Sequence, residues 1–201
     1  MTNILGHSRR CQIQPVTFHT LLILLYGTGL RISEALSLTL ADVNLSASLL
    51  TIHNTKFFMT RLVPIGPQLT SVLVTYAKKR QLLPRPARND SAFFANRYGN
   101  ELTRGTTERI FRLLCDQASI RRMDKGRFQQ RLHDIRHSFV LNRLISWYRQ
   151  GAGVQRLLPF LSTCLGHVDV KATQRYLAMT PELLYEASLR FQRYAIGGGA
   201  S

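Results

Sequence analysis

The stretch Gly27-Thr28-Gly29-Leu30-Arg31-Ile32-Ser33-Glu34-Ala35-Leu36 separates two predicted helices. From Pro15 onward, apolar residues recur at helical spacing, and the glycines interrupt that helix. A second helix is expected to begin near Leu30 and to run to Leu40. Arg31 then lies in its first turn, where a guanidinium and free backbone N–H groups together favour an anion. Taken alone the pattern is weak, because an arginine at such a place is more often a solvated surface residue.

Beyond this stretch, the sequence predicts a small hairpin and further helices. Short strands are expected over Leu49–His53 and Arg61–Ile65, joined through Asn54–Thr60, and Ala92–Asn96 is a candidate third strand. Helices are expected over 68–81, 133–150, 154–164 and 169–178, and from Thr103 or Thr106 onward with a core stripe of Phe111, Leu114, Cys115 and Ala118. A last helix is expected to start at Thr180-Pro181. The predicted fold class is therefore mainly α with a small antiparallel β-sheet, an α+β arrangement.

The charge of the chain indicates a polyanionic partner. Lys and Arg number 27 against 11 Asp and Glu, a formal charge of +16, and each phosphate that a basic side chain neutralises releases counterions. Charge alone fits a non-catalytic basic binder equally well. The cysteines, Cys11, Cys115 and Cys164, are too widely spaced for a zinc knuckle or a redox motif. With no apolar run near the ~20 residues that cross a bilayer, we expect a soluble cytoplasmic protein with no membrane partner.

The segment His133-Asp134-Ile135-Arg136-His137 is a second candidate for chemistry. His133 and Arg136 are three residues apart and share a face if the segment is helical. The structural alternative pairs Arg136 with Asp134 or Glu34 and leaves His133 to cap a helix. A zinc site is disfavoured because no third ligand lies at suitable spacing and nearby arginines repel a cation.

The third candidate runs from Leu165 to Tyr176, with the sequence Leu-Gly-His-Val-Asp-Val-Lys-Ala-Thr-Gln-Arg-Tyr. A glycine turn presents His167, and Tyr176 follows nine residues later. Alone, Tyr176 is one of seven tyrosines, and an amphipathic residue at the edge of the core is the ordinary interpretation.

Together and in this order, the three segments resemble the signatures of the tyrosine recombinase (phage integrase) family. The family's patterns are G-T-G-L-R-x-S-E-x-L, H-x-L-R-H-[ST]-F, and L-G-H followed nine residues later by Tyr. This chain offers Gly27–Leu36, His133–Phe139 with Ile135 in place of the usual leucine, and Leu165–Tyr176. Thr55-Lys56 and the strand Arg61–Ile65 are similar to the family's lysine-bearing hairpin. The resemblance covers roughly Pro15 to Phe191, and the ordered conjunction is far more specific than any single motif.

The resemblance implies a site-specific DNA recombinase or integrase that cuts and rejoins DNA through a covalent 3′-phosphotyrosyl intermediate, without metal or cofactor. The implied catalytic residues are Arg31, Lys56, His133, Arg136, His167 and Tyr176. Tyr176 is the implied nucleophile, and the two arginines bind the non-bridging phosphate oxygens. The two histidines complete this clamp, and one of them accepts the tyrosine proton. Lys56 protonates the departing 5′ oxygen.

The resemblance also implies partners and a domain organisation. The partners are double-stranded DNA and other recombinase protomers in a synaptic complex, to which a C-terminal helix with the stripe Leu184, Ala187, Phe191 and Tyr194 is expected to dock in trans. We expect a flexible basic lead-in over 1–14, a catalytic domain over 15–194 and a flexible tail over 195–201, with the family's N-terminal DNA-binding domain absent.

Two alternative functions remain open from the sequence. One is a type IB topoisomerase-like activity, which shares the chemistry but relaxes supercoils without exchanging partners. The other is a non-catalytic basic DNA-binding module, a truncated and inactive recombinase remnant.

Overall fold

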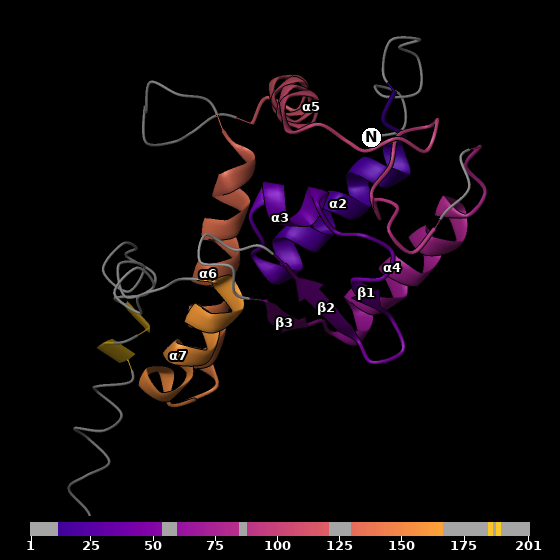
Figure 1. Ribbon diagram of the computed structural model, residues 1–201. Coiled ribbons are helices and arrows are strands. Elements are labelled where there is room, and N and C mark those ends of the chain that lie inside the picture. The colour runs from indigo at the N-terminus through magenta and orange to yellow at the C-terminus, as the bar shows by residue number, and fades with distance from the viewer. Residues whose placement is uncertain are drawn as a thin grey trace, which may run out of the picture. The chain divides into compact units, whose positions relative to one another are not determined.

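The computed structural model describes residues 12–53, 60–84, 88–120 and 130–166, together with 185, 186, 188 and 189. It divides into two compact units, Met1–Arg136 and His137–Ser201. The helices are α2 (Pro15–Thr28), α3 (Ile32–Leu36), α4 (Pro67–Arg80), α5 (Arg104–Gln117), α6 (Leu132–Arg149) and α7 (Val154–Leu165). The strands are β1 (Val43–Asn44), β2 (Leu49–Ile52) and β3 (Arg61–Pro64) (Figure 1). The predicted fold class, mainly α with a small antiparallel sheet, is therefore confirmed. Within these residues, no helix has the length and apolarity needed to span a membrane.

A single glycine ends α2. Gly29 has φ 65° and ψ 19°, and its N–H donates to the carbonyl of Leu25. This left-handed conformation closes the helix at a position where any side chain with a Cβ is strained. The chain can then turn within three residues into α3, as Figure 1 shows.

Helix α3 is shorter than the sequence predicts. It ends at Leu36, because the Asp42 carboxylate accepts from both the N–H and the hydroxyl of Thr39, at 2.8 and 2.7 Å, and so forms a turn in place of another helical turn. At the other end, Arg31 has an extended backbone with ψ 147° and is the N-cap residue. The expectation that a helix begins near Leu30, includes Arg31 in its first turn and runs to Leu40 is therefore wrong by about two residues at the start and four at the end.

The sheet has the order β1-β2-β3, with both pairs antiparallel. Leu50 pairs with Val63 and Ile52 with Arg61, so the predicted hairpin is confirmed in its two strands. The third strand is Val43–Asn44, and the expected strand Ala92–Asn96 makes only isolated bridges. Strand alternation fails in that segment because Phe93 and Phe94 are adjacent in sequence and both fully buried.

The core of the first unit lies between α2, the sheet and α4. Tyr76 of α4 packs against Phe93 and Phe94, with ring centroids 5.1–5.4 Å apart within this trio, and the Tyr76 hydroxyl accepts from the N–H of Ala95. Ile13 is also buried, at 1% exposure, and belongs to this core. Ile13, which the sequence analysis places in the lead-in over 1–14, is therefore a core residue, and residues 1–11 lie outside the described part of the chain.

The later helices follow their predicted positions closely. The Thr103 hydroxyl accepts from the N–H of Thr106 and caps α5, as one of the two predicted caps. Leu114 and Cys115 are buried as expected, whereas Ala118 is exposed because it is the C-cap residue. In the second unit, α6 and α7 pack through a cluster of apolar residues, namely Val140, Leu144, Val154, Leu158, Leu161 and Leu165. The expected helix 169–178 and the stripe Leu184, Ala187, Phe191 and Tyr194 lie outside the described residues.

Gly29→Ala is expected to destabilise the protein by about 1–2 kcal/mol, because alanine is strained at positive φ. Gly105→Ala is the matched control: it lies in α5 with no atom within 4 Å of the added Cβ, and alanine there is expected to be neutral or stabilising by up to ~1 kcal/mol. Urea unfolding of both variants measures the two free energies of unfolding. Equal effects of the two substitutions would contradict the role assigned to the Gly29 conformation.

Candidate active site

A buried carboxylate holds Arg31 in place. Glu34, on α3, is 7% exposed, and its Oε1 accepts from Arg31 Nη1 at 2.9 Å. Its Oε2 accepts from the backbone N–H of Arg31 at 2.9 Å and from Arg61 Nη2, on β3, at 2.8 Å. The backbone contact satisfies a free N–H at the start of α3, and the side-chain contact fixes the direction of the guanidinium.

These contacts set the charge state of Glu34. Burial by itself raises the pKa of this carboxyl, but the hydrogen bond from Arg61, the backbone N–H of Arg31 and the two guanidinium charges outweigh it and lower the pKa below its ordinary value of 4.5. Glu34 is therefore ionised near neutral pH and shared between two cations.

Arg136, on α6, is anchored to the same junction between α2 and α3. Its side chain is buried at 2% exposure, and its Nη1 donates to the carbonyl of Gly29 at 2.7 Å. Asp134 caps the start of α6 by accepting from the N–H of Arg131 at 2.9 Å. The residue that caps α6 is thus Asp134. The Glu34 carboxylate, which the sequence offered as a partner for Arg136, contacts Arg31 and Arg61.

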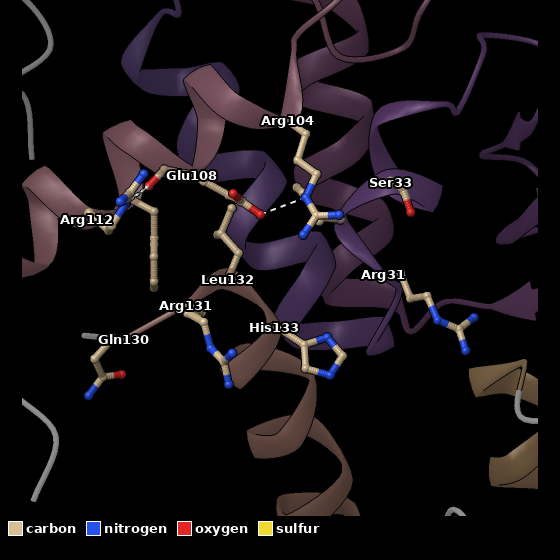
Figure 2. A pocket seen from close by; sticks show the side chains of 11 residues that line it. Arg31, Ser33, Arg104, Glu108, Arg112, Gln130, Arg131, Leu132 and His133 are labelled. Carbon is tan, nitrogen blue, oxygen red and sulfur yellow. Dashed lines mark hydrogen bonds and ion pairs between the residues drawn. The ribbon is translucent and has the colours of Figure 1, made fainter. Parts of the chain in front are cut away.

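A cavity of about 580 Å³ opens beside these residues, within the first unit. Figure 2 shows the side chains that line it, from the start of α3, from α5 and from the start of α6. Arg31 and His133 line it together with Arg104, Arg112 and Arg131. Glu108 is the carboxylate among the described lining residues, and it pairs with Arg104 at 2.7 Å. A cavity of this size lined by four arginines favours a phosphate-bearing ligand.

The cavity brings together two of the six residues assigned from the sequence, Arg31 and His133. Arg136 is placed by its contact to Gly29, two residues before Arg31 in the chain. Lys56, His167 and Tyr176 lie outside the described residues. Just before His167, α7 ends as the sequence predicts, at Gly166 in a left-handed conformation with φ 66°.

Sequence reasoning missed several contributors. The strand pattern predicts Arg61 only as the first residue of a strand. An arginine at an inward-facing strand position is, however, a signal for a buried ion partner. The spacing of Arg31 and Glu34, three residues apart, also indicated a pair. No periodicity pointed to Arg104, Arg112 and Arg131, because exposed arginines on a basic chain have no distinguishing pattern.

Comparison with known proteins gives consistent matches. The phage integrase family matches residues 1–182. The putative integrase/recombinase y4rB of Sinorhizobium fredii is 42% identical over 184 residues, which are 92% of this chain and 58% of that protein. The tyrosine recombinase XerD of Oceanobacillus iheyensis is 32% identical over 161 residues, 80% of this chain and 49% of that protein. The chain thus spans about half the length of these curated relatives.

Solved structures share the fold. The XerA recombinase crystal structure matches with a TM-score of 0.69 at 22% identity, over 88% of this chain and 57% of that one. The XerH site-specific recombinase, bound to a palindromic difH substrate in a post-cleavage complex, matches with a TM-score of 0.63 at 24% identity, over 86% of this chain and 45% of that one. At these identities the likeness establishes the fold alone.

Glu34→Gln is expected to destabilise the protein near neutral pH by about 3 kcal/mol, because it leaves the buried Arg61 charge without its anion. Since the folded-state pKa of Glu34 is lowered, its contribution is present above pH 4.5 and is lost as the pH falls through the lower folded-state value. The gap in unfolding free energy between parent and variant should therefore narrow below pH 4.5, as urea titrations between pH 3 and 7 can measure.

Glu108→Gln is the control for this comparison. It removes a carboxylate whose ion pair with Arg104 is largely exposed, so the expected change is below ~1 kcal/mol. A gap between parent and Glu34→Gln that stays constant over the whole pH range would contradict the role of the Glu34 charge.

Proposed function

This chain belongs to the phage integrase family, and from that premise we propose that it carries the catalytic centre of a site-specific DNA recombinase or integrase. The enzyme cuts and rejoins DNA strands through a covalent 3′-phosphotyrosyl intermediate. The observation that carries the proposal is the cavity in which Arg31 and His133 meet, with Arg136 anchored at the adjacent junction.

The arginines supply the electrostatics of the reaction. In the attack on a phosphodiester, negative charge gathers on the equatorial oxygens, and a planar guanidinium can donate to two of them at once. Arg31 and Arg136 are each restrained by contacts within the protein, to Glu34 and to Gly29. Donors that are already oriented need little reorganisation when charge develops, which is the condition for strong transition-state stabilisation.

The remaining residues complete a balanced exchange. The Tyr176 oxygen forms a bond to the scissile phosphorus, and the bond from phosphorus to the 5′ oxygen breaks. His133 or His167 accepts the tyrosine proton, and Lys56 gives a proton to the departing 5′ oxygen. Rejoining reverses these steps with a 5′ hydroxyl as the nucleophile. Because one phosphoester bond replaces another, the exchange draws on no external energy source.

DNA and further protomers are the proposed partners. The charge of +16 supports binding to a polyanion, and the XerH relative was solved on its DNA substrate. Strand exchange between two duplexes requires cleavage on each, so we assign this chain to an assembly of several protomers on paired sites. The C-terminal stripe of Leu184, Ala187, Phe191 and Tyr194 is the proposed contact between protomers.

Tyr176→Phe is expected to abolish covalent adduct formation and to leave DNA affinity within about twofold, since only the phenolic oxygen is lost. The assay incubates the full chain with a nicked suicide duplex and detects an SDS-resistant protein–DNA adduct, whose site is then mapped by mass spectrometry. Tyr185→Phe, which changes an exposed tyrosine, is the matched control and should react like the parent.

An adduct that persists in Tyr176→Phe and maps to another tyrosine would overturn the nucleophile assignment. A parent chain that binds the duplex but never forms an adduct would favour the non-catalytic DNA-binding module. If adduct forms, relaxation of a supercoiled plasmid without recombination between two sites would favour the topoisomerase-like alternative.

A further inference from the structure

We propose that Arg61 is a positioning residue, which acts through Glu34 to hold Arg31 in the orientation that binds the phosphate. The proposal rests on the proposed function for its catalytic consequence, but its structural part can be tested without any reaction. It concerns a residue on the sheet that does not line the cavity.

The contacts form a short chain between separate elements. Arg61, the first residue of β3, pairs with Ile52 in the sheet, and its Nη2 reaches Glu34 Oε2 at 2.8 Å. That same oxygen accepts from the backbone N–H of Arg31, while Oε1 accepts from its guanidinium. The sheet therefore restrains one carboxylate oxygen, and the carboxylate restrains Arg31 at both its backbone and its side chain.

Burial makes this restraint effective. The side chains of Arg61 and Glu34 are 7% and 8% exposed, whereas that of Arg31 is 36% exposed. The guanidinium of Arg31 is about a third exposed, and an ion pair in contact with water is held less firmly than a buried one. A second, buried cation fixes the carboxylate in one position, in the way that outer contacts orient the ligands of other reactive centres.

The charge distribution gives Arg61 a second effect. A carboxylate that serves Arg31 alone neutralises it, and a neutralised guanidinium attracts phosphate weakly. Because Glu34 divides its charge between two guanidinium groups, it neutralises Arg31 less than a carboxylate that serves Arg31 alone. Orientation and residual charge both depend on the same contact.

The alternative is that Arg61 only stabilises the fold, and Arg80 offers a control for it. Arg80 is also a buried arginine, 1% exposed, and its Nε donates to the carbonyl of Ala92. Arg80→Met therefore removes a buried guanidinium elsewhere in the same unit. The loss of stability in Arg80→Met therefore measures what it costs to remove a buried arginine while the contacts of Glu34 stay unchanged.

The first experiment measures amide hydrogen exchange of the full 201-residue chain. In Arg61→Met, the Arg31 amide should lose about tenfold or more in protection, because its acceptor is no longer fixed. Glu34→Gln should in turn reduce protection at Arg61, as expected of a coupled pair. Arg80→Met should leave the Arg31 amide changed only as far as global stability changes. Equal loss at this amide in Arg61→Met and Arg80→Met would overturn the proposal.

The second experiment separates cleavage from binding on the nicked suicide duplex. Arg61→Met should slow adduct formation by about tenfold to a hundredfold and change DNA affinity by less than about threefold. Arg61→Lys should recover part of the rate, since an ammonium can still donate one hydrogen bond to Glu34. If Arg61→Met does not fold, Arg61→Lys takes its place in both experiments. The expected losses in cleavage rate and in protection of the Arg31 amide are then smaller than those given for Arg61→Met.

The outcomes distinguish this proposal from the proposed function. A cleavage rate in Arg61→Met equal to that of the parent overturns the positioning role and leaves the recombinase function intact. If the parent itself forms no adduct, the proposed function fails, and the reciprocal hydrogen-exchange effects decide by themselves whether Arg61 positions Arg31.

Discussion

One buried negative charge organises the candidate site of this strongly basic chain. Glu34 is ionised because two guanidinium groups and a backbone N–H compensate the cost of burying it. Without this carboxylate, the buried Arg61 would lose an anionic partner, and Arg31 would lose the group that orients its guanidinium. Stability and the direction of the Arg31 side chain, which we propose binds phosphate, thus depend on the same few contacts.

The backbone between α2 and α3 is the second constraint. Gly29 adopts a positive φ, which ends α2 and lets the chain reach Arg31 in an extended conformation. The Gly29 carbonyl then accepts from Arg136, a residue of a helix far along the chain. Two arginines that are distant in sequence are consequently placed from a single turn, and a substitution that moves this turn moves both.

The sequence was sufficient for the features that depend on local chemistry. Periodicity located the helices to within one or two residues in most cases, and the Thr103 cap and the Gly166 turn follow from side-chain and backbone preferences. Arg31 and His133, which the sequence predicts at one site, line one cavity, and their catalytic roles stay predictions. Motifs whose spacing is fixed by chemistry preserve such information even when single residues are ambiguous.

The errors have a different physical origin. Helix α3 stops early because Asp42 captures Thr39, and Ala92–Asn96 is not a strand because Phe93 and Phe94 are both drawn into the core around Tyr76. The contact from Arg61 to Glu34 joins residues 27 positions apart. The last two depend on tertiary neighbours, which no local pattern in a single sequence specifies. The turn between Thr39 and Asp42 is local, since the two residues are three apart, and helical periodicity alone does not reveal it.

The central claim is that Arg31 stabilises the charge of a phosphate under attack, and a duplex matched in shape but not in charge at the scissile linkage tests it most directly. In one duplex the scissile phosphate is replaced by a methylphosphonate, which has the same shape but lacks the negative charge. Arg31→Ala should slow adduct formation on the ordinary phosphate by about 10²–10³, and by much less on the methylphosphonate, where there is little charge to stabilise. An equal loss of rate on both linkages would contradict the account.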